Sequence, residues 1–256
     1  MEIKNITYSY HDKKNVLENV NAGIELGKIT TIIGPNGSGK STLLGIMAKH
    51  YTPRKGNVIL DGKGLSAYKS KELAKKIAIV NQQNSAPNDL TVEKLVSYGR
   101  LPYKTIFSSD KDADKEAIEW VLSETNIQHK RHETIDQLSG GERQRVWIAM
   151  SLAQQTPFLF LDEPTTYLDI YYQYEVLDLI NRLNKEYEMT IVMVLHDINQ
   201  AIRYSDKIIV MKNGTVFVHG DPDTIITVDL MKEVYGIDMM IKNEKDTGLY
   251  TIPIGI

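Results

Sequence analysis

Short apolar runs alternate with longer amphipathic stretches along much of the chain. The run at 29–33 is rich in β-branched residues, and the runs at 158–161, 190–195 and 207–211 are almost wholly apolar. Runs of this length and composition predict strands that are buried on both faces of a sheet. Helices with apolar positions at helical spacing are predicted to begin near 40, 170 and 198. This alternation predicts a parallel α/β core.

Two other parts of the chain have different patterns. Residues 2–10 alternate loosely enough to predict a strand, and residues 15–33 predict two strands around a turn at 26–28. Between about 86 and 156 the spacing becomes helical, with one helix beginning at Ser109–Asp110 and another at Ser139. The pattern therefore predicts a helical insert in the α/β core.

The same pattern divides the chain into expected parts. We expect one domain over 1–256, in which 1–85 and 157–256 form the β subdomain and the core, and 86–156 form the helical subdomain. From Asp221 the sequence predicts one short helix and a tail without a predicted structure.

Composition excludes several classes of protein. The 256 residues include no cysteine, which excludes disulfides, thiolate metal sites and a cysteine nucleophile. A net charge of −3 gives no global electrostatic reason to expect a nucleic-acid partner. No apolar run approaches the ~20 residues that span a bilayer, and the first residues lack the pattern of a signal peptide. We therefore expect a soluble chain whose membrane role, if it has one, depends on a partner.

One glycine-rich segment directly follows the strand at 29–33. Residues 34–41 match the pattern G-x-x-x-x-G-K-[ST], in which backbone N–H groups and a helix N-terminus surround a polyphosphate. Lys40 is expected to reach the β- and γ-phosphates, and the Ser41 hydroxyl is expected to bind Mg²⁺. The predicted nucleotide-binding residues are Gly34, Pro35, Asn36, Gly37, Ser38, Gly39, Lys40, Ser41 and the next residue, Thr42.

Two acidic residues follow the apolar strand at 158–161. Ligands of open parallel sheets gather at the carboxyl ends of the strands, so Asp162 and Glu163 are placed near the predicted phosphate site. Asp162 is expected to hold Mg²⁺ through its water shell. Glu163 is expected to polarise the water that attacks the γ-phosphate.

A second helix start has the features of an anion site. In the segment 138–144, Ser139 and Glu142 stand three residues apart, as in a capping box, and Gly140 and Gly141 permit close approach of another backbone. Helix N-termini of this kind bind phosphates. The chain therefore has two predicted phosphate-binding helix starts, and one of them is available to the nucleotide of another molecule.

Together these motifs resemble the ATP-binding cassette family over nearly the whole chain. The resemblance implies an α/β fold: a P-loop NTPase parallel-sheet core with an N-terminal antiparallel β subdomain and an inserted α-helical subdomain. It also implies ATP and Mg²⁺ as cofactors and a head-to-tail dimer with two ATP molecules. Each ATP would lie between the Lys40 loop of one copy and Ser139–Glu142 of the other.

The resemblance also assigns single residues. Tyr10 resembles the aromatic residue that stacks on adenine, with Tyr8 as the alternative. Gln82, after the strand at 77–80, resembles the glutamine that senses Mg²⁺ and the γ-phosphate, with Gln83 as the alternative. The last assignments are Asp169, as the acid that crosses the dimer interface, and His196, as the histidine that contacts the γ-phosphate.

A finer resemblance concerns cargo. The segments 91–103, 145–150 and 197–201 are similar to those of the ATPase subunits of importers for iron–siderophores, haem and cobalamin. This implies a homodimer on the cytoplasmic face of the membrane that is bound to permease subunits. An external binding protein would deliver the chelate to these permease subunits. The segment from Gln82 to Tyr103 would face the permease. The alternatives are an importer of another solute and a soluble cassette ATPase for an assembly complex such as one for iron–sulfur clusters.

One charged segment has an ambiguous pattern. His129, His132 and Glu133 have a spacing that occurs in metal sites. The neighbouring Lys130 and Arg131 make the segment strongly charged, which indicates a solvated linker. We therefore expect no metal ion there.

Overall fold

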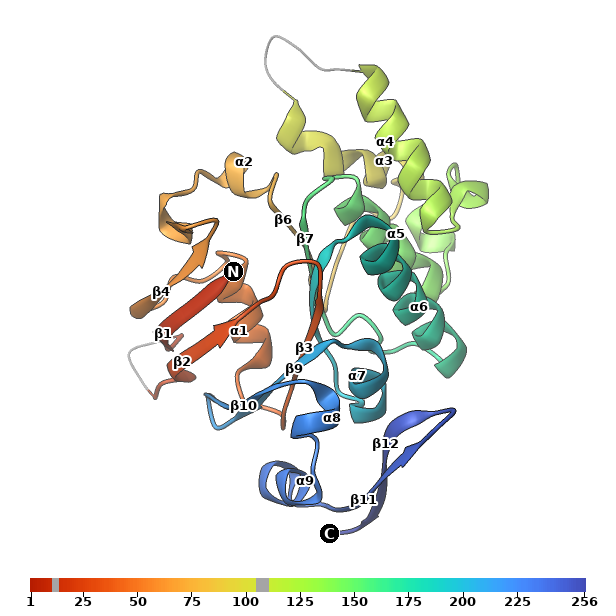
Figure 1. Cartoon of the computed structure of the whole chain (residues 1–256). Helices are drawn as coiled ribbons and strands as arrows, with labels where there is room; N and C mark the ends of the chain where they lie inside the picture. Colours follow the sequence, from red (N-terminus) through yellow and green to blue (C-terminus); the bar gives the residue numbers. More distant parts are fainter. Residues whose placement is uncertain (11–13, 105–110) are drawn as a thin grey trace. The chain divides into compact units, whose positions relative to one another are not determined.

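The computed structural model describes residues 1–10, 14–104 and 111–256. By its internal contacts the chain divides into two compact units, and each is described by itself (Figure 1). The first unit comprises Met1–Ala67 and Thr190–Ile256, and the second comprises Tyr68–Met189. These limits do not coincide with the expected subdomain limits at 85, 86, 156 and 157, which stay a prediction.

An antiparallel sheet begins the first unit. Its strand order is β2-β1-β4-β5. Strand β1 pairs with β2 and with β4, and Ile3 and Ile6 of β1 are buried. The register with β2 shifts between these two residues, where Asn5 has φ +52°. The predicted early strands are confirmed. The strands are β1 (Glu2–Tyr8), β2 (Leu17–Gly23), β4 (Lys55–Leu60) and β5 (Lys63–Gly64), followed by the 3₁₀ turn η1 (Leu65–Ala67).

The parallel strands of the first unit form its core. Strand β3 (Ile29–Ile33) lies between β8 (Thr190–Val194) and β9 (Lys207–Lys212), parallel to both, and β10 (Thr215–Gly220) pairs antiparallel with β9. Every residue of β3 and β8 is buried, as expected of strands that are covered on both faces. The predicted helices follow as α1 (Lys40–Met47) and α7 (Ile198–Tyr204).

The C-terminal part of the first unit has more structure than the sequence predicts. Two short helices, α8 (Pro222–Ile225) and α9 (Val228–Tyr235), precede a hairpin of β11 (Asp238–Glu244) and β12 (Gly248–Gly255). The expectation of a single short helix was therefore wrong, and the tail, for which the sequence predicted no structure, forms this hairpin. The hairpin is attached to α7, because Asn199 makes three hydrogen bonds with Thr251 at 2.8–3.1 Å.

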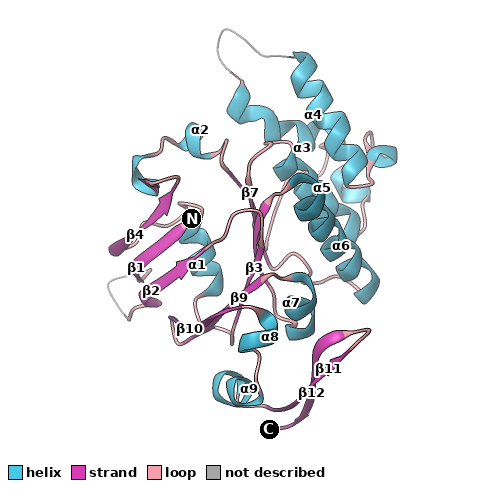
Figure 2. Cartoon of the chain, viewed as in Figure 1, coloured by secondary structure: helices cyan, strands magenta, loops and turns pink. Residues whose placement is uncertain are grey.

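The second unit contains two parallel strands and most of the helices (Figure 2). Strand β6 (Ile77–Val80) pairs with β7 (Phe158–Asp162), and α5 packs against β6 and against helices α3, α4 and α6. The helices are α2 (Ser70–Leu73), α3 (Val92–Ser97), α4 (Lys111–Glu124), α5 (Gly140–Leu152) and α6 (Ile170–Tyr187), with the 3₁₀ segments η2 (Tyr98–Tyr103), η3 (Gln128–Lys130) and η4 (Ile135–Gln137).

The fold class is therefore α/β, as predicted, with parallel and antiparallel sheets and a helical region. The predicted helix start at Ser109–Asp110 lies outside the described residues. Across the part of the chain that the structure describes, no helix is both long enough and apolar enough to cross a bilayer.

Candidate functional site

The glycine-rich loop connects β3 to α1 in the first unit. Gly34 has φ +149°, and a Cβ added there would lie 2.2 Å from the carbonyl oxygen of Met211. Gly39 precedes α1 with φ +99°, and its added Cβ would lie 2.5 Å from Leu17 Cδ2. Both positions therefore favour glycine for conformation, and Gly34 also requires it for space because the atom beside it belongs to the backbone.

The loop folds around the ammonium group of Lys40. Lys40 Nζ donates to the carbonyl oxygen of Gly34 at 2.9 Å and to that of Pro35 at 3.1 Å, and its side chain is buried. The hydroxyl of Ser38 is also buried and has no hydrogen-bond partner among the described residues. A buried cation and an unsatisfied hydroxyl beside a helix N-terminus fit an anionic phosphate group.

An exposed aromatic ring lies next to the start of α1. The Tyr10 hydroxyl hydrogen bonds with Thr42 Oγ1 at 2.8 Å, and the ring of Tyr10 meets those of Tyr8 and Tyr51 edge to face at 5.1 and 5.5 Å. Tyr10 is 49% exposed, whereas Tyr8 is partly covered. The greater exposure of Tyr10 favours it over Tyr8 as the ring on which adenine stacks.

His196 follows β8 at the same end of the sheet as the glycine-rich loop. Strands β3 and β8 run parallel with Ile32 opposite Val194, so the residues after both strands leave the sheet at its carboxyl edge. His196 is exposed there, and the next residue, Asp197, caps α7 by accepting a hydrogen bond from Gln200 N at 2.8 Å. The cap fixes the backbone direction immediately after His196.

In the second unit, a glutamine and a glutamate come together after β6 and β7. Gln82 Nε2 donates to Glu163 Oε2 at 2.5 Å, and Thr166 Oγ1 donates to the same oxygen at 3.0 Å. Glu163 has φ +52°, directly after Asp162 at the end of β7. The contact favours Gln82 over Gln83 as the residue that acts with Glu163.

The segment at 139–142 forms the predicted capping box at the start of α5. Ser139 N donates to Glu142 Oε2 at 2.8 Å, and Glu142 N donates to Ser139 Oγ at 3.3 Å. Hydrogen bonds to the carboxylate from the backbone and the side chain of Ser139 lower the pKa of the Glu142 carboxyl, so it stays ionised. An added Cβ at Gly141 would lie 2.8 Å from a ring carbon of Tyr172, so a side chain there would displace this ring.

Asp169 is the N-cap residue immediately before α6, beside an exposed apolar group. Tyr167, with φ +65°, is 88% exposed, and Ile170 and Tyr171 are also largely exposed. Large apolar side chains that gather on a surface indicate a contact with another molecule.

Two supporting residues were missed by sequence reasoning. Tyr235 of α9 hydrogen bonds with the backbone of Gly34, and burial raises the pKa of its phenol, which stays protonated. Thr166 orients Glu163, as described above. Tyr235 lies 201 positions along the chain from Gly34 and has no local signal, whereas Thr166 stands three residues after Glu163 in a recognisable acidic loop.

Comparison with known proteins decides the family. The sequence model of the family described as ABC transporter matches residues 17–166. The chain belongs to the ABC transporter family. It is 42% identical to the petrobactin import ATP-binding protein FpuC of Bacillus anthracis, over 96% of this chain and 91% of that one. It is 47% identical to the iron(3+)-hydroxamate import ATP-binding protein FhuC of Bacillus subtilis, over 91% and 86%.

Solved structures of ABC proteins have the same fold. A metal-chelate type ABC transporter in an inward-facing conformation superposes with a TM-score of 0.84 at 26% identity, over 100% of this chain and 96% of that one. The ATP-binding cassette MJ0796, dimeric and bound to ADP and Pi, gives 0.74 at 33% identity, over 86% and 98%. This ABC chain is therefore an ATP-binding ATPase subunit.

Proposed function

We propose that this ATPase powers the import of an iron–siderophore complex through membrane permease subunits. The observation that carries the proposal is the agreement among relatives aligned over nine-tenths or more of this chain. Their names specify petrobactin import, iron(3+)-hydroxamate import and, at 42% identity in Escherichia coli, ferric enterobactin transport. Two of these names state ferric iron, and a fourth relative, from Bacillus subtilis, is named as a probable siderophore transport protein. The proposal therefore names the cargo class and leaves haem and cobalamin as less favoured cargoes.

We assign the nucleotide contacts to residues whose geometry suits them. Lys40 neutralises the phosphates, the ring of Tyr10 supports adenine, and His196 contacts the γ-phosphate. Glu163 accepts a proton from the attacking water. Gln82 and Thr166 both donate to the same carboxylate oxygen of Glu163, so a rearrangement of Gln82 would release part of the hydrogen-bonding capacity of that oxygen.

A magnesium ion is the second cofactor of the proposal. Ser41, Gln82 and Asp162 supply hydroxyl, amide and carboxylate oxygens, which are the ligand types that Mg²⁺ prefers. Bound Mg²⁺ would neutralise charge on the phosphates during hydrolysis.

The proposal includes a second copy of the chain. The capped helix start at Ser139–Glu142 offers backbone N–H groups to the ATP of the partner, and Asp169 with its exposed neighbours faces the other copy. ATP then favours the closed dimer because its phosphates contact both copies only in that state. Hydrolysis removes this link and reopens the dimer. The subunit would act at the cytoplasmic face of the membrane, next to a permease and its external binding protein, without nucleic acid.

Uptake assays test the cargo directly. Cells that lack the chain should lose uptake of at least one radioactive iron chelate from a panel of hydroxamate and catecholate complexes. The wild-type chain should restore uptake, and Glu163→Gln should not restore it. Normal uptake of every chelate, together with loss of a different solute, would reject the assignment.

Co-purification tests the partner. The chain should be recovered with membrane permease subunits from detergent extracts. Recovery with soluble assembly proteins alone would favour the alternative of a cassette ATPase for an assembly complex.

A further inference from the structure

A short strap precedes the signature helix α5. We define the strap as residues 131–135, and it runs antiparallel to the chain at the start of α3. Val92 N donates to the carbonyl oxygen of Glu133 at 3.0 Å, and Ile135 N donates to that of Leu90 at 3.0 Å. The strap leads through η4 to Ser139, so its position sets where α5 begins.

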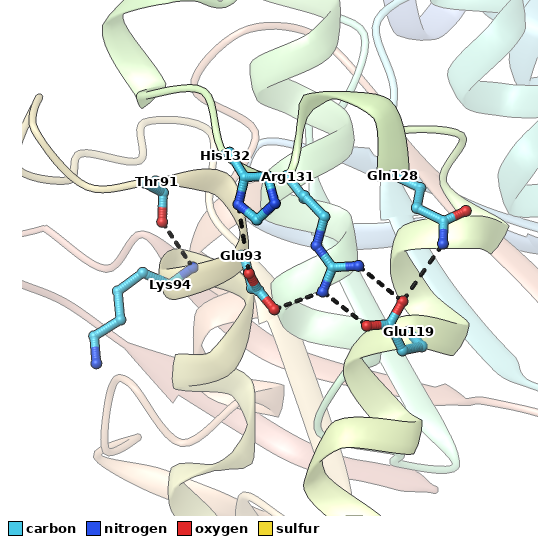
Figure 3. A network of polar contacts seen from close by, with 7 residues as sticks. All are labelled: Thr91, Glu93, Lys94, Glu119, Gln128, Arg131 and His132. Carbon is cyan, nitrogen blue, oxygen red and sulfur yellow. Dashed lines mark hydrogen bonds and ion pairs between the residues drawn. The ribbon is translucent and has the colours of Figure 1, made fainter.

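The guanidinium of Arg131 ties the strap to two helices (Figure 3). Arg131 Nη2 lies 2.6 Å from Glu93 Oε1 of α3 and 2.7 Å from Glu119 Oε1 of α4, and Nη1 lies 3.0 Å from Glu119 Oε2. The bonds from Arg131 lower the pKa of the Glu119 carboxyl, which therefore stays ionised. The planar guanidinium suits this paired geometry, whereas an ammonium group does not.

This arrangement corrects the expectation of a solvated linker at Arg131, although His132 is 83% exposed. The Arg131 side chain is only partly exposed, and its Nε is buried without a hydrogen-bond partner among the described residues. His132 Nδ1 lies 3.9 Å from Glu93 Oε2, so the second carboxylate oxygen of Glu93 faces the strap as well (Figure 3).

The neighbouring residue continues the network into the signature. Lys130 Nζ lies 3.1 Å from Glu133 Oε2 and 3.7 Å from Glu142 Oε1. Glu142 is also the residue that accepts the hydrogen bond from Ser139 N. A continuous set of charged contacts therefore runs from α3 and α4 through the strap to the capping box.

We propose that Arg131 is a positioning residue for the signature. It holds the strap so that Ser139–Glu142 points its backbone N–H groups at the nucleotide of the partner copy. This role rests on the proposed function, because it matters only if the signature completes a site on a second copy. Loss of Arg131 should weaken ATP-dependent dimerisation and leave ATP binding by the glycine-rich loop unchanged.

A matched control exists in the same unit. Arg182 of α6 also makes a close ion pair with a glutamate of α4, at 2.6 Å from Glu124 Oε2, but among the described residues it makes no hydrogen bond or ion pair with the strap. Arg182→Met removes the same charge and a bond of the same length. It therefore measures what the loss of any arginine–glutamate link between helices does to the unit.

The experiment uses full-length Glu163→Gln as the parent, in which bound ATP persists. Sedimentation with increasing ATP measures dimerisation, and fluorescence of a mant-labelled ATP on dilute monomer measures binding. Arg131→Met should raise the ATP concentration for half dimerisation by about tenfold, within the usual range of coupling between sites, and leave mant-ATP affinity within about twofold. Arg131→Lys should lie between it and the parent, because a single ammonium cannot make the paired contact.

Each alternative outcome has a defined meaning. Equal dimerisation by the Arg131→Met and Arg182→Met variants would overturn the positioning role, as would a parallel loss of mant-ATP affinity. If Arg131→Met does not fold, Glu119→Gln weakens the link between Arg131 and α4 while Arg131 stays in place. Normal ATP-dependent dimerisation of the Glu119→Gln variant would overturn the positioning role. A parent that never dimerises with ATP would instead reject the proposed function, and the role with it.

Discussion

Replacing Arg100 with methionine should destabilise the second unit strongly. Arg100 is 4% exposed, and it connects η2 to two distant elements. Its Nε donates to Asp114 Oδ1 at 2.8 Å, and its Nη1 donates to the carbonyl oxygen of Ala153 at 2.7 Å and to Gln155 Oε1 at 2.8 Å. The guanidinium also lies 4.0 Å from the centre of the Tyr103 ring.

The magnitude follows from what the substitution leaves behind. Methionine fills much of the space but cannot donate a hydrogen bond, so the carbonyl oxygen of Ala153 loses its partner in a buried place. The Asp114 carboxylate, whose side chain is 15% exposed, loses its cation. Breaking a buried pair from one side costs about 3–5 kcal/mol. That cost corresponds to an unfolding equilibrium constant larger by about two to nearly four powers of ten.

Fluorescence in urea measures this effect locally. The chain has two tryptophans, Trp120 in α4 and Trp147 in α5, and both belong to the second unit. Arg182→Met is the control. The Arg182 side chain is 42% exposed, so its ion pair with Glu124 should contribute under about 1 kcal/mol to the free energy of unfolding. If Arg100→Met costs no more than this control, with an unchanged denaturant slope, the assignment of buried pairing to Arg100 is wrong.

Three further predictions concern the first unit. Asn199→Ala should lower the free energy of opening of the C-terminal hairpin by about 1–3 kcal/mol, because it removes the three hydrogen bonds between Asn199 and Thr251. Faster hydrogen exchange in β11 and β12 would show this change. Burial lowers the pKa of His50 and of His219 below 6.5, so the unfolded chain binds more protons than the folded chain at mildly acidic pH. The free energy of unfolding should therefore fall as the pH drops below about 6.5. His219→Gln should make this fall with pH less steep when the free energy is measured by urea titration. Gly34→Ala should abolish mant-ATP binding, since its methyl group would overlap a backbone oxygen 2.2 Å away; retained binding would contradict the loop geometry.

The parallel core and the phosphate loop could be predicted from the sequence because their signals are local. Strands β3, β7 and β8 are short apolar runs, and each begins within one residue of its predicted position. The capping box at Ser139 and Glu142 depends on residues three apart, so a motif could identify it.

The remaining features depend on contacts between distant residues. The C-terminal hairpin is attached through Asn199 and Thr251, which are 52 residues apart, and its own strands are mostly polar or exposed. Arg131 finds Glu93 38 positions earlier, and a charged segment looks solvated until that partner is known. The sequence favours Gln82 over the adjacent Gln83 only through the predicted end of the strand at 77–80, and the contact with Glu163 supports that choice.

The central claim is that each ATP site contains residues from two copies of the chain. Mixing two inactive variants tests it most directly. Lys40→Met disables the phosphate loop and Ser139→Arg disables the signature, so each variant alone should hydrolyse almost no ATP. In a mixed dimer one site carries both defects and the other carries neither, so an equal mixture should recover up to about a quarter of wild-type hydrolysis. A mixture no more active than its separate components would contradict the account.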